Sequence, residues 1–137
     1  LLPKTNKLFM KHYWWQKILK YDNIIKGRLI TPGYRSTTFI NEVELNENDI
    51  IITGNRHSII EYAVKSKVKL IVLTNGQEIN KEWLELAKTN KVNIIKTNYS
   101  TLDTIKKFNF CNNVETIINT PKAKSSTKLD ALLYMFW

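Results

Sequence analysis

The sequence of 137 residues contains a single cysteine, Cys111, and 12 acidic side chains against 21 basic ones. One cysteine excludes an internal disulfide framework and is typical of proteins of the reducing cytosol, so we expect a cytoplasmic location. No uncharged apolar run approaches the roughly 18 residues that a membrane-spanning helix needs, so we expect no membrane partner. The chain begins Leu1-Leu2-Pro3-Lys4, without an initiator methionine or a signal-type apolar stretch, and we expect it to be a piece of a longer protein.

Residues that commonly carry catalysis or bind metal ions are also scarce. Only two histidines are present, His12 and His57, and they lie far apart in the sequence, while Cys111 has no evident partner. No group of His, Cys and Asp has the spacing of a zinc site, and neither a Walker loop nor a dinucleotide-binding glycine fingerprint occurs. We therefore predict no catalytic residue, no metal site and no cofactor, and we predict that the chain is not an enzyme.

The excess of positive charge, +9 in total, is distributed unevenly along the chain. Residues 1–40 carry a net charge of +7, residues 41–120 are neutral, and residues 121–137 carry +2. Because the middle of the chain is balanced, its charge does not indicate that the central fold binds nucleic acid. One acidic stretch alternates with Val43 and Leu45, a pattern typical of the solvent-exposed face of a strand. Its members are Glu42, Glu44, Glu47 and Asp49.

Short apolar runs alternate with segments of helical spacing between residues 49 and 108. Runs rich in Ile, Val and Leu predict buried strands at 49–53, 68–73 and 92–95. The spacing of apolar residues between and after these runs predicts three helices, over 57–65, around 78–87 and through 102–108. This β-α-β-α-β-α order predicts the α/β fold class, with a mainly parallel sheet and helices on its faces.

The flanking segments have a different character. Residues 7–21 combine basic and aromatic side chains in a pattern typical of an amphipathic helix, and residues 38–40 are expected to be extended. A polar, linker-like stretch follows Pro121, and the apolar segment from Leu129 to Trp137 has no room to complete an element. The predicted organisation is an N-terminal basic aromatic helix (1–22), an α/β domain (23–120), and a linker with an apolar C-terminal segment (121–137).

The loops that follow the three predicted strands are the candidate site, because ligands of open α/β sheets bind at the carboxyl ends of the strands. Backbone N–H groups at helix N-termini favour anions, the Arg56 guanidinium suits phosphate or carboxylate, and Tyr99 can stack on a ring. The same residue types also serve any tight strand-to-helix turn, so turn formation alone stays open. The candidate ligand-binding residues are Asn55, Arg56, Thr74, Asn75, Gly76, Thr97, Tyr99, Ser100 and Thr101.

These loops also carry a resemblance to a known family. Residues 49–101 resemble the DRTGG domain, a small regulatory α/β module of bacterial proteins, and the likeness covers roughly residues 20–120. The Asp-Arg of the family corresponds to Asn55-Arg56, and its Thr-Gly-Gly corresponds to Thr74-Asn75-Gly76. Its closing Tyr-Asp-Thr corresponds to Tyr99-Ser100-Thr101.

The resemblance implies a non-catalytic regulatory domain. Such domains are linked to paired CBS domains, which bind adenine nucleotides, in some manganese-dependent inorganic pyrophosphatases, and a distant similarity exists to the N-terminal domain of HPr kinase/phosphorylase. The implied partners are a second copy of the chain, a small anionic or adenine-nucleotide ligand, and adjacent CBS or catalytic domains.

The leading hypothesis is therefore a regulatory and dimerisation domain that binds a small anionic or nucleotide-like ligand at the strand ends. Dimerisation would bury some of a set of aromatic residues that otherwise pack internally: Trp14, Trp15, Tyr134, Phe136 and Trp137. The alternative is a nucleic-acid-binding module in which Tyr13, Trp14 and Tyr21 stack between basic side chains. Those basic residues are Lys4, Lys7, Lys11, Lys17, Lys20, Lys26, Arg28 and Arg35. An enzyme that uses Arg56 and His57 is the least favoured hypothesis.

Overall fold

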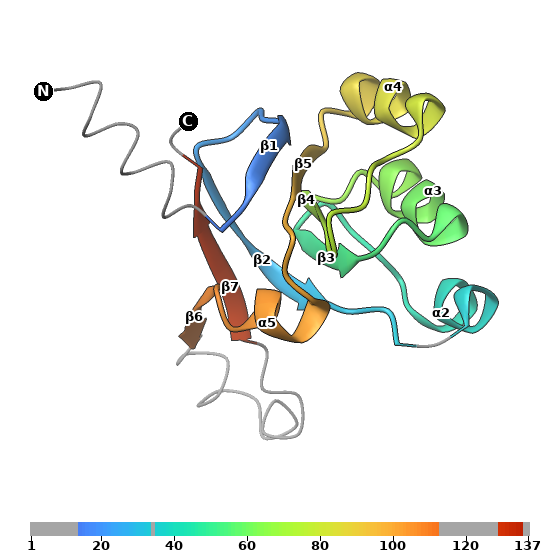
Figure 1. Cartoon of the computed structure of the whole chain (residues 1–137). Helices are drawn as coiled ribbons and strands as arrows, with labels where there is room; N and C mark the ends of the chain where they lie inside the picture. The colour runs from blue at the N-terminus through green and yellow to red at the C-terminus, as the bar shows by residue number, and fades with distance from the viewer. Residues whose placement is uncertain (1–13, 34, 113–128, 136–137) are drawn as a thin grey trace, which may run out of the picture.

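The computed structural model describes residues 14–33, 35–112 and 129–135. Seven strands within these ranges form one sheet in the order β1-β5-β4-β3-β2-β7-β6 (Figure 1). The strands are β1 (Gln16–Leu19), β2 (Ile24–Ile30), β3 (Asp49–Thr53), β4 (Leu70–Leu73), β5 (Asn93–Lys96), β6 (Asn109–Asn112) and β7 (Leu129–Tyr134). The helices are α2 (Ser36–Glu42), α3 (His57–Lys65), α4 (Lys81–Asn90) and α5 (Thr101–Ile105). None of these helices is long and apolar enough to cross a membrane.

The centre of the sheet is parallel and its outer strands are antiparallel. Strands β2, β3, β4 and β5 run parallel to one another, whereas β1 pairs antiparallel with β5, and β7 pairs antiparallel with both β2 and β6. Parallel neighbours require a crossover connection, and α2, α3 and α4 supply it between successive strands. The predicted α/β class is confirmed, and the complete sheet is mixed.

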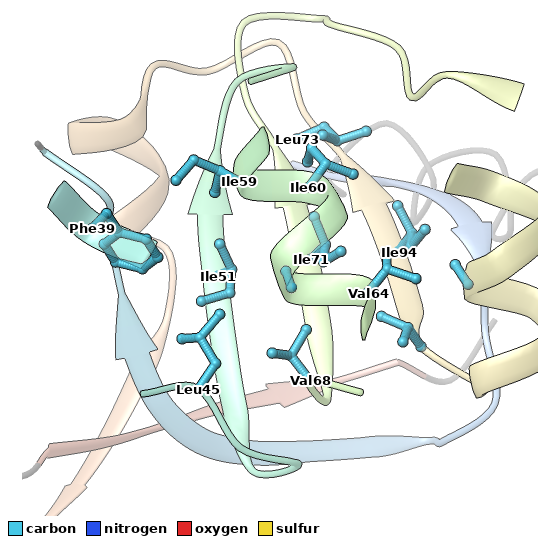
Figure 2. Close-up of a cluster of buried hydrophobic side chains, with 13 residues drawn as sticks. Phe39, Leu45, Ile51, Ile59, Ile60, Val64, Val68, Ile71, Leu73 and Ile94 are labelled. Atoms are coloured by element: carbon cyan, nitrogen blue, oxygen red, sulfur yellow. The ribbon is translucent and has the colours of Figure 1, made fainter. Parts of the chain in front are cut away.

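Strand β3 is buried along its whole length because both faces of the sheet are covered at this point. On one face, Ile51 packs with Ile71 and Ile94 of the neighbouring strands beneath α3, which contributes Ile59 and Ile60 (Figure 2). Helices α2, α3 and α4 lie together over this face (Figure 1). The apolar runs that predicted strands therefore become two-sided core strands.

The opposite face of β3 carries a second core. Ile50 and Ile52 pack there with Trp15, with Phe108 after α5, and with Leu133 of β7. Because side chains alternate along a strand, neighbouring residues of β3 contribute to the two cores in turn. The centre of the sheet is thus held between α2, α3 and α4 on one side and the region around α5 on the other.

The predicted N-terminal helix is wrong over its described part. Residues Gln16–Leu19 form β1, in which Gln16 lies opposite Lys96 and Lys17 lies opposite Ile95 of β5. Pairing with β5 is favoured over a helix because β5 would otherwise end the sheet with unpaired backbone groups. It also leaves Trp15 buried in the second core, at 8% exposure. Residues 1–13 lie outside the described residues.

Two further flanking predictions are also wrong. Residues 38–40 belong to α2, where Phe39 is 1% exposed and packs against the first core. The C-terminal segment does complete an element, because β7 inserts between β2 and β6 and buries Ala131 and Leu133 on one face. Strand β6, the partner of β7 at the edge, was not predicted, and the linker-like residues 121–128 lie outside the described residues.

The acidic stretch does not form the predicted exposed strand, because Glu42 ends α2 and Glu44 and Glu47 lie between α2 and β3. Glu42, Glu44 and Glu47 are exposed, but Asp49 is 1% exposed at the start of β3. Asp49 is buried because Arg28 of β2 lies opposite it in the parallel register and pairs with its carboxylate.

Candidate ligand-binding site

The loops after β4 and β5 are hydrogen-bonded to each other at the carboxyl edge of the sheet. The backbone N–H of Asn75 donates to the carbonyl oxygen of Tyr99, and that of Gly76 donates to the carbonyl oxygen of Thr97, each at 2.8 Å. The hydroxyl oxygens of Thr74 and Thr101 lie 3.4 Å apart. These contacts bring two of the three predicted loops into direct contact.

The backbone of the loop after β4 explains how its N–H groups reach the neighbouring loop. Asn75 and Gly76 both have left-handed conformations, with φ of 57° and 68°. Glycine enters this region without steric cost and asparagine enters it more readily than most residues. A Cβ atom at position 76 would lie 3.0 Å from Oδ1 of Asn98. This turn therefore tolerates asparagine at position 75 and favours glycine at position 76.

The loop after β3 joins the same edge through side chains of the β4–α4 connection. Oε1 of Gln77 accepts a short hydrogen bond from the backbone N–H of Asn55. The Asn55 side chain donates through Nδ2 to Oδ1 of Asn80, which precedes α4, at 3.3 Å. The structure therefore brings all nine predicted residues to one edge of the sheet. Gln77 and Asn80 were not among them, because their roles depend on contacts between loops.

Arg56 lies at the start of α3 but its guanidinium is already engaged. Nη1 donates to the carbonyl oxygen of Pro32 at 2.7 Å, and Nη2 donates to Oγ of Ser36 at 3.3 Å. Arg56 therefore ties the segment before α2 to the first turn of α3.

Two predicted residues are occupied by structural hydrogen bonds. Thr97 is 4% exposed, and its hydroxyl donates to the carbonyl oxygen of Trp14 at 2.5 Å, which fixes the chain before β1. Ser100 caps α5, because its Oγ accepts from the backbone N–H of Asp103 at 3.2 Å. These two side chains position the edge.

Tyr99 is the predicted residue with a large exposed surface. Tyr99 is 42% exposed, and Nζ of Lys107 lies 4.6 Å from the centre of the Tyr99 ring. A cation over an aromatic face at this distance is attracted to the ring. The aromatic ring of the loop after β5 thus lies against a positive charge from the residues that follow α5.

His57 belongs to a separate cluster at the start of α3 and α4. Its Nδ1 lies 3.0 Å from Nδ2 of Asn80 and 3.1 Å from Nε1 of Trp83, and its Nε2 lies 3.6 Å from a carboxylate oxygen of Glu82. The imidazole and the Trp83 ring meet edge to face, with ring centres 5.0 Å apart. This cluster joins the two helices next to the candidate site.

Metal ligands are not gathered in the part of the chain that the structure describes. No group of three or more His, Cys, Asp or Glu residues lies close enough there to hold a metal ion. The chemistry available at the carboxyl edge is therefore that of hydrogen-bond donors, a guanidinium and an aromatic ring.

The chain is similar in sequence to parts of two known bacterial proteins. The chain is 37% identical over 82 residues to the cobalt-dependent inorganic pyrophosphatase of Clostridium perfringens, which covers 60% of this chain and 15% of that protein. It is 42% identical over 52 residues to the antilisterial bacteriocin subtilosin biosynthesis protein AlbA of Bacillus subtilis, over 38% of this chain and 12% of that protein. The chain thus spans a small part of the length of both relatives.

A solved structure resembles this fold. It is the crystal structure of the CBS and DRTGG domains of the regulatory region of Clostridium perfringens pyrophosphatase, complexed with the activator diadenosine tetraphosphate. The TM-score is 0.51 at 27% sequence identity, over 57% of this chain and 33% of the other. The model of one family, the DRTGG domain, matches residues 37–111, which include β3, β4, β5 and all three strand-end loops. The chain therefore belongs to the DRTGG domain family, as its loop residues predict.

Proposed function

We propose that this chain is a regulatory domain that binds a small anionic or adenine-nucleotide-like ligand at the carboxyl edge of its sheet. The observation that carries the proposal is the direct hydrogen bonding of the three strand-end loops, which makes one continuous polar edge. The relationship to a regulatory region solved with a nucleotide activator supports it. In this proposal the ligand is an effector, and catalysis belongs to another domain of a longer protein, with CBS domains among the expected neighbours.

The candidate residues divide into three roles in this proposal. The exposed residues Asn55, Asn75, Gly76 and Tyr99 contact the ligand, and the half-buried residues Arg56, Ser100 and Thr101 border it. The buried residues Thr74 and Thr97 hold the loops in place. An aromatic ring beside a lysine suits a nucleobase, and the turn N–H groups and the guanidinium suit its phosphates.

The test is a thermal-shift screen followed by titration calorimetry, with adenosine, AMP, ATP, diadenosine tetraphosphate and inorganic phosphate. Binding to the folded state raises Tm, by an amount equivalent to about 2.7 kcal/mol at a ligand concentration of 100 times Kd. We expect Tyr99→Leu to weaken the binding of adenine nucleotides. Tyr21→Leu is the control and should leave their affinity unchanged, because Tyr21 is similarly exposed (44%) but lies in the β1–β2 turn. No rise in Tm with any ligand would reject the proposal.

We also propose that the chain forms a homodimer through the outer part of the sheet. Ile24 of β2 and Tyr134 of β7 lie directly opposite each other, so their side chains share one face, and they are 52% and 46% exposed. Trp15 is excluded from such a contact by its burial, and Trp14 packs edge to face on Phe108 with ring centres 5.4 Å apart. Phe136 and Trp137, the remaining candidates, lie outside the described residues.

The nucleic-acid hypothesis gains no support from the described part of the chain. Arg28 is paired with Asp49, and Lys17 and Lys26 lie on β1 and β2, which three other strands separate in the sheet. Lys4, Lys7, Lys11 and Tyr13 lie outside the described residues. The described basic side chains are therefore spread over the molecule, and we do not propose this function.

A further inference from the structure

The first turn of α3, like that of α2, has backbone donors and no acidic residue of its own, whereas α4 and α5 each have one. The first hydrogen bond of this helix runs from the N–H of Ile60 to the carbonyl oxygen of Arg56, at 2.9 Å. In the described part of the chain, no backbone carbonyl oxygen accepts from the N–H groups of His57, Ser58 and Ile59. The first turn contains no acidic residue and its N-cap side chain makes no capping bond. Helix α4, by comparison, has Glu82 in its first turn.

A buried hydroxyl without a partner lies beneath this turn. Thr53 is the last residue of β3 and is 3% exposed, and its Oγ1 has no hydrogen-bond partner within the described structure. Thr53 is two positions after Ile51, so its side chain lies on the same face of the sheet, where Ile51 packs against Ile59 at the start of α3 (Figure 2). Buried hydroxyls are normally bonded, because leaving one without a partner costs free energy. An acceptor oxygen bound at this turn would give the Thr53 hydroxyl the partner that it lacks within the described structure.

A side-chain oxygen from the next loop already occupies the turn between Thr53 and α3. Oε1 of Gln77 accepts from the N–H of Asn55, and a Cβ atom at Gly54 would lie 2.7 Å from the same oxygen. Glycine at position 54 thus leaves room for this acceptor oxygen close to the backbone. Gln77 is itself exposed, so its carboxamide can leave without disturbing a core.

The charges around this turn favour an anion. Arg56 is the N-cap residue of α3, with its guanidinium bonded to Pro32 and Ser36, and the positive end of the α3 dipole lies at this turn. One carboxylate of the His57 cluster, that of Glu82 in α4, lies 3.6 Å from Nε2 of His57. A tetrahedral oxyanion offers several acceptor oxygens at once, which matches a site that has a hydroxyl, backbone N–H groups and a guanidinium as donors.

We propose that a phosphate group binds at the first turn of α3, held by Thr53, Asn55 and Arg56, and that one of its oxygens replaces Oε1 of Gln77 on the Asn55 N–H. Gln77 is then an internal competitor that sets the affinity of the site. This inference rests on the proposed ligand-binding function and narrows it to one of the three loops and to one chemical group. The phosphate is either inorganic or part of a nucleotide.

The experiment is calorimetric titration of the 137-residue chain with inorganic phosphate, AMP and adenosine. Gln77→Ala removes the competitor, and we expect it to tighten phosphate binding about three- to tenfold, the value of one hydrogen bond. Gln77→Glu keeps the shape but places a negative charge on the turn, and we expect it to abolish phosphate binding. Asn48→Asp is the matched control, because it makes the same amide-to-carboxylate change before β3, at the opposite edge of the sheet.

Thr53→Val supplies an independent measurement because it removes only the hydroxyl. We expect weaker phosphate binding without a fall in Tm, a combination that a purely structural hydroxyl would not give. If AMP and phosphate bind with equal affinity and adenosine does not bind, the ligand is inorganic phosphate. If AMP binds more tightly than phosphate, the ligand is a nucleotide. Unchanged phosphate affinity in both Gln77 variants would overturn the inference.

The two proposals fail in different ways. If AMP binds with the same affinity to the wild type and to every variant, the ligand site lies elsewhere on the edge, so the proposed function holds and this inference fails. The opposite outcome is that the Gln77 and Thr53 substitutions change phosphate affinity as expected, but AMP binds no more tightly than inorganic phosphate. In that case the inference holds and the nucleotide part of the proposed function fails.

Discussion

Arg28 and Asp49 face each other across the first parallel pair of strands and form two hydrogen bonds. Nε of Arg28 donates to Oδ1 of Asp49, and Nη2 donates to Oδ2, each at 3.0 Å. The backbone N–H of Asn46 donates to the same carboxylate at 2.8 Å. The pair thus fixes the register of β2 against β3 and closes the turn that precedes β3.

Replacement of Arg28 by alanine is expected to destabilise the protein by about 2 kcal/mol. The loss leaves the Asp49 carboxylate, at 1% exposure, without its cation, and removal of one partner from a buried pair costs about 3–5 kcal/mol. The value is lower here because the Arg28 side chain is 38% exposed, so solvent screens the interaction. Urea denaturation measures the change, and Arg35→Ala, which removes an exposed arginine, is the control. Equal effects of the two substitutions would contradict the prediction.

The same pair gives a prediction about pH. The hydrogen bond to Asp49 and its negative charge, against the opposing effect of burial, raise the pKa of Arg28 above its ordinary value. A raised pKa in the folded state stabilises the fold below the unfolded-state pKa, and the effect is lost only as pH rises through the folded-state pKa. We therefore expect the stability difference between the wild type and Arg28→Ala to stay constant from about pH 7 to pH 10. A difference that shrinks in this range would be the contrary result.

Asn93→Ala is expected to cost about 3 kcal/mol in free energy of unfolding, because four hydrogen bonds meet at a fully buried side chain. Its Oδ1 accepts from the backbone N–H of Tyr21 at 2.7 Å and of Asp22 at 3.2 Å. Its Nδ2 donates to Oδ2 of Asp22 at 2.9 Å and to the carbonyl oxygen of Lys69 at 2.8 Å. Chemical denaturation gives the cost, and faster amide exchange at Tyr21 and Asp22 would show that the β1–β2 turn has loosened. Asn41→Ala, at an exposed position of α2, is expected to cost little.

Two buried threonines should respond oppositely to the same substitution. Thr104→Val removes a hydroxyl that donates to the carbonyl oxygen of Ser100 at 2.6 Å, and we expect a loss of about 1 kcal/mol. Thr53→Val removes a hydroxyl without a partner in the described structure, and we expect a gain of about 1 kcal/mol. Thermal and urea unfolding of both variants measure the signs. A loss of stability in Thr53→Val would show that this hydroxyl has a partner inside the protein.

The proposed homodimer predicts a change of molecular mass on substitution of Ile24. Sedimentation velocity should give a dimer for the wild type and a monomer for Ile24→Lys, because a charge in an apolar contact carries an unpaid desolvation penalty. Leu102→Lys is the matched control, since Leu102 is more exposed still, at 64%, but lies on α5. A wild-type monomer, or a dimer that tolerates Ile24→Lys, would rule out this interface.

The middle of the fold was predictable from the sequence because its signals are local. The runs at 49–53 and 92–95 are apolar, β-branched and bounded by turn residues, and the intervening apolar residues have helical spacing. The strand-end rule then placed the candidate loops on one edge without any knowledge of contacts. These features need only a few neighbouring residues to be recognised.

The remaining features depend on partners that are distant in the sequence. Strand β1 is stabilised by pairing with β5, and β7 is stabilised by pairing with β2. Neither strand is therefore evident from its local sequence pattern. The burial of Asp49 depends on Arg28, and the engagement of Arg56 depends on Pro32. Gln77 entered the site through its contact with Asn55, which its position in the sequence does not reveal.

The place of β7 in the sheet also affects how the protein is assembled. Strand β2 pairs with β3 on one side and with β7 on the other, and β7 is the last described strand of the chain. During synthesis, β2 therefore lacks its second neighbour until residues Leu129–Tyr134 of β7 have left the ribosome. Pairings between distant segments slow folding, so we expect the parallel centre to form early and the antiparallel edge of β2, β7 and β6 to close last.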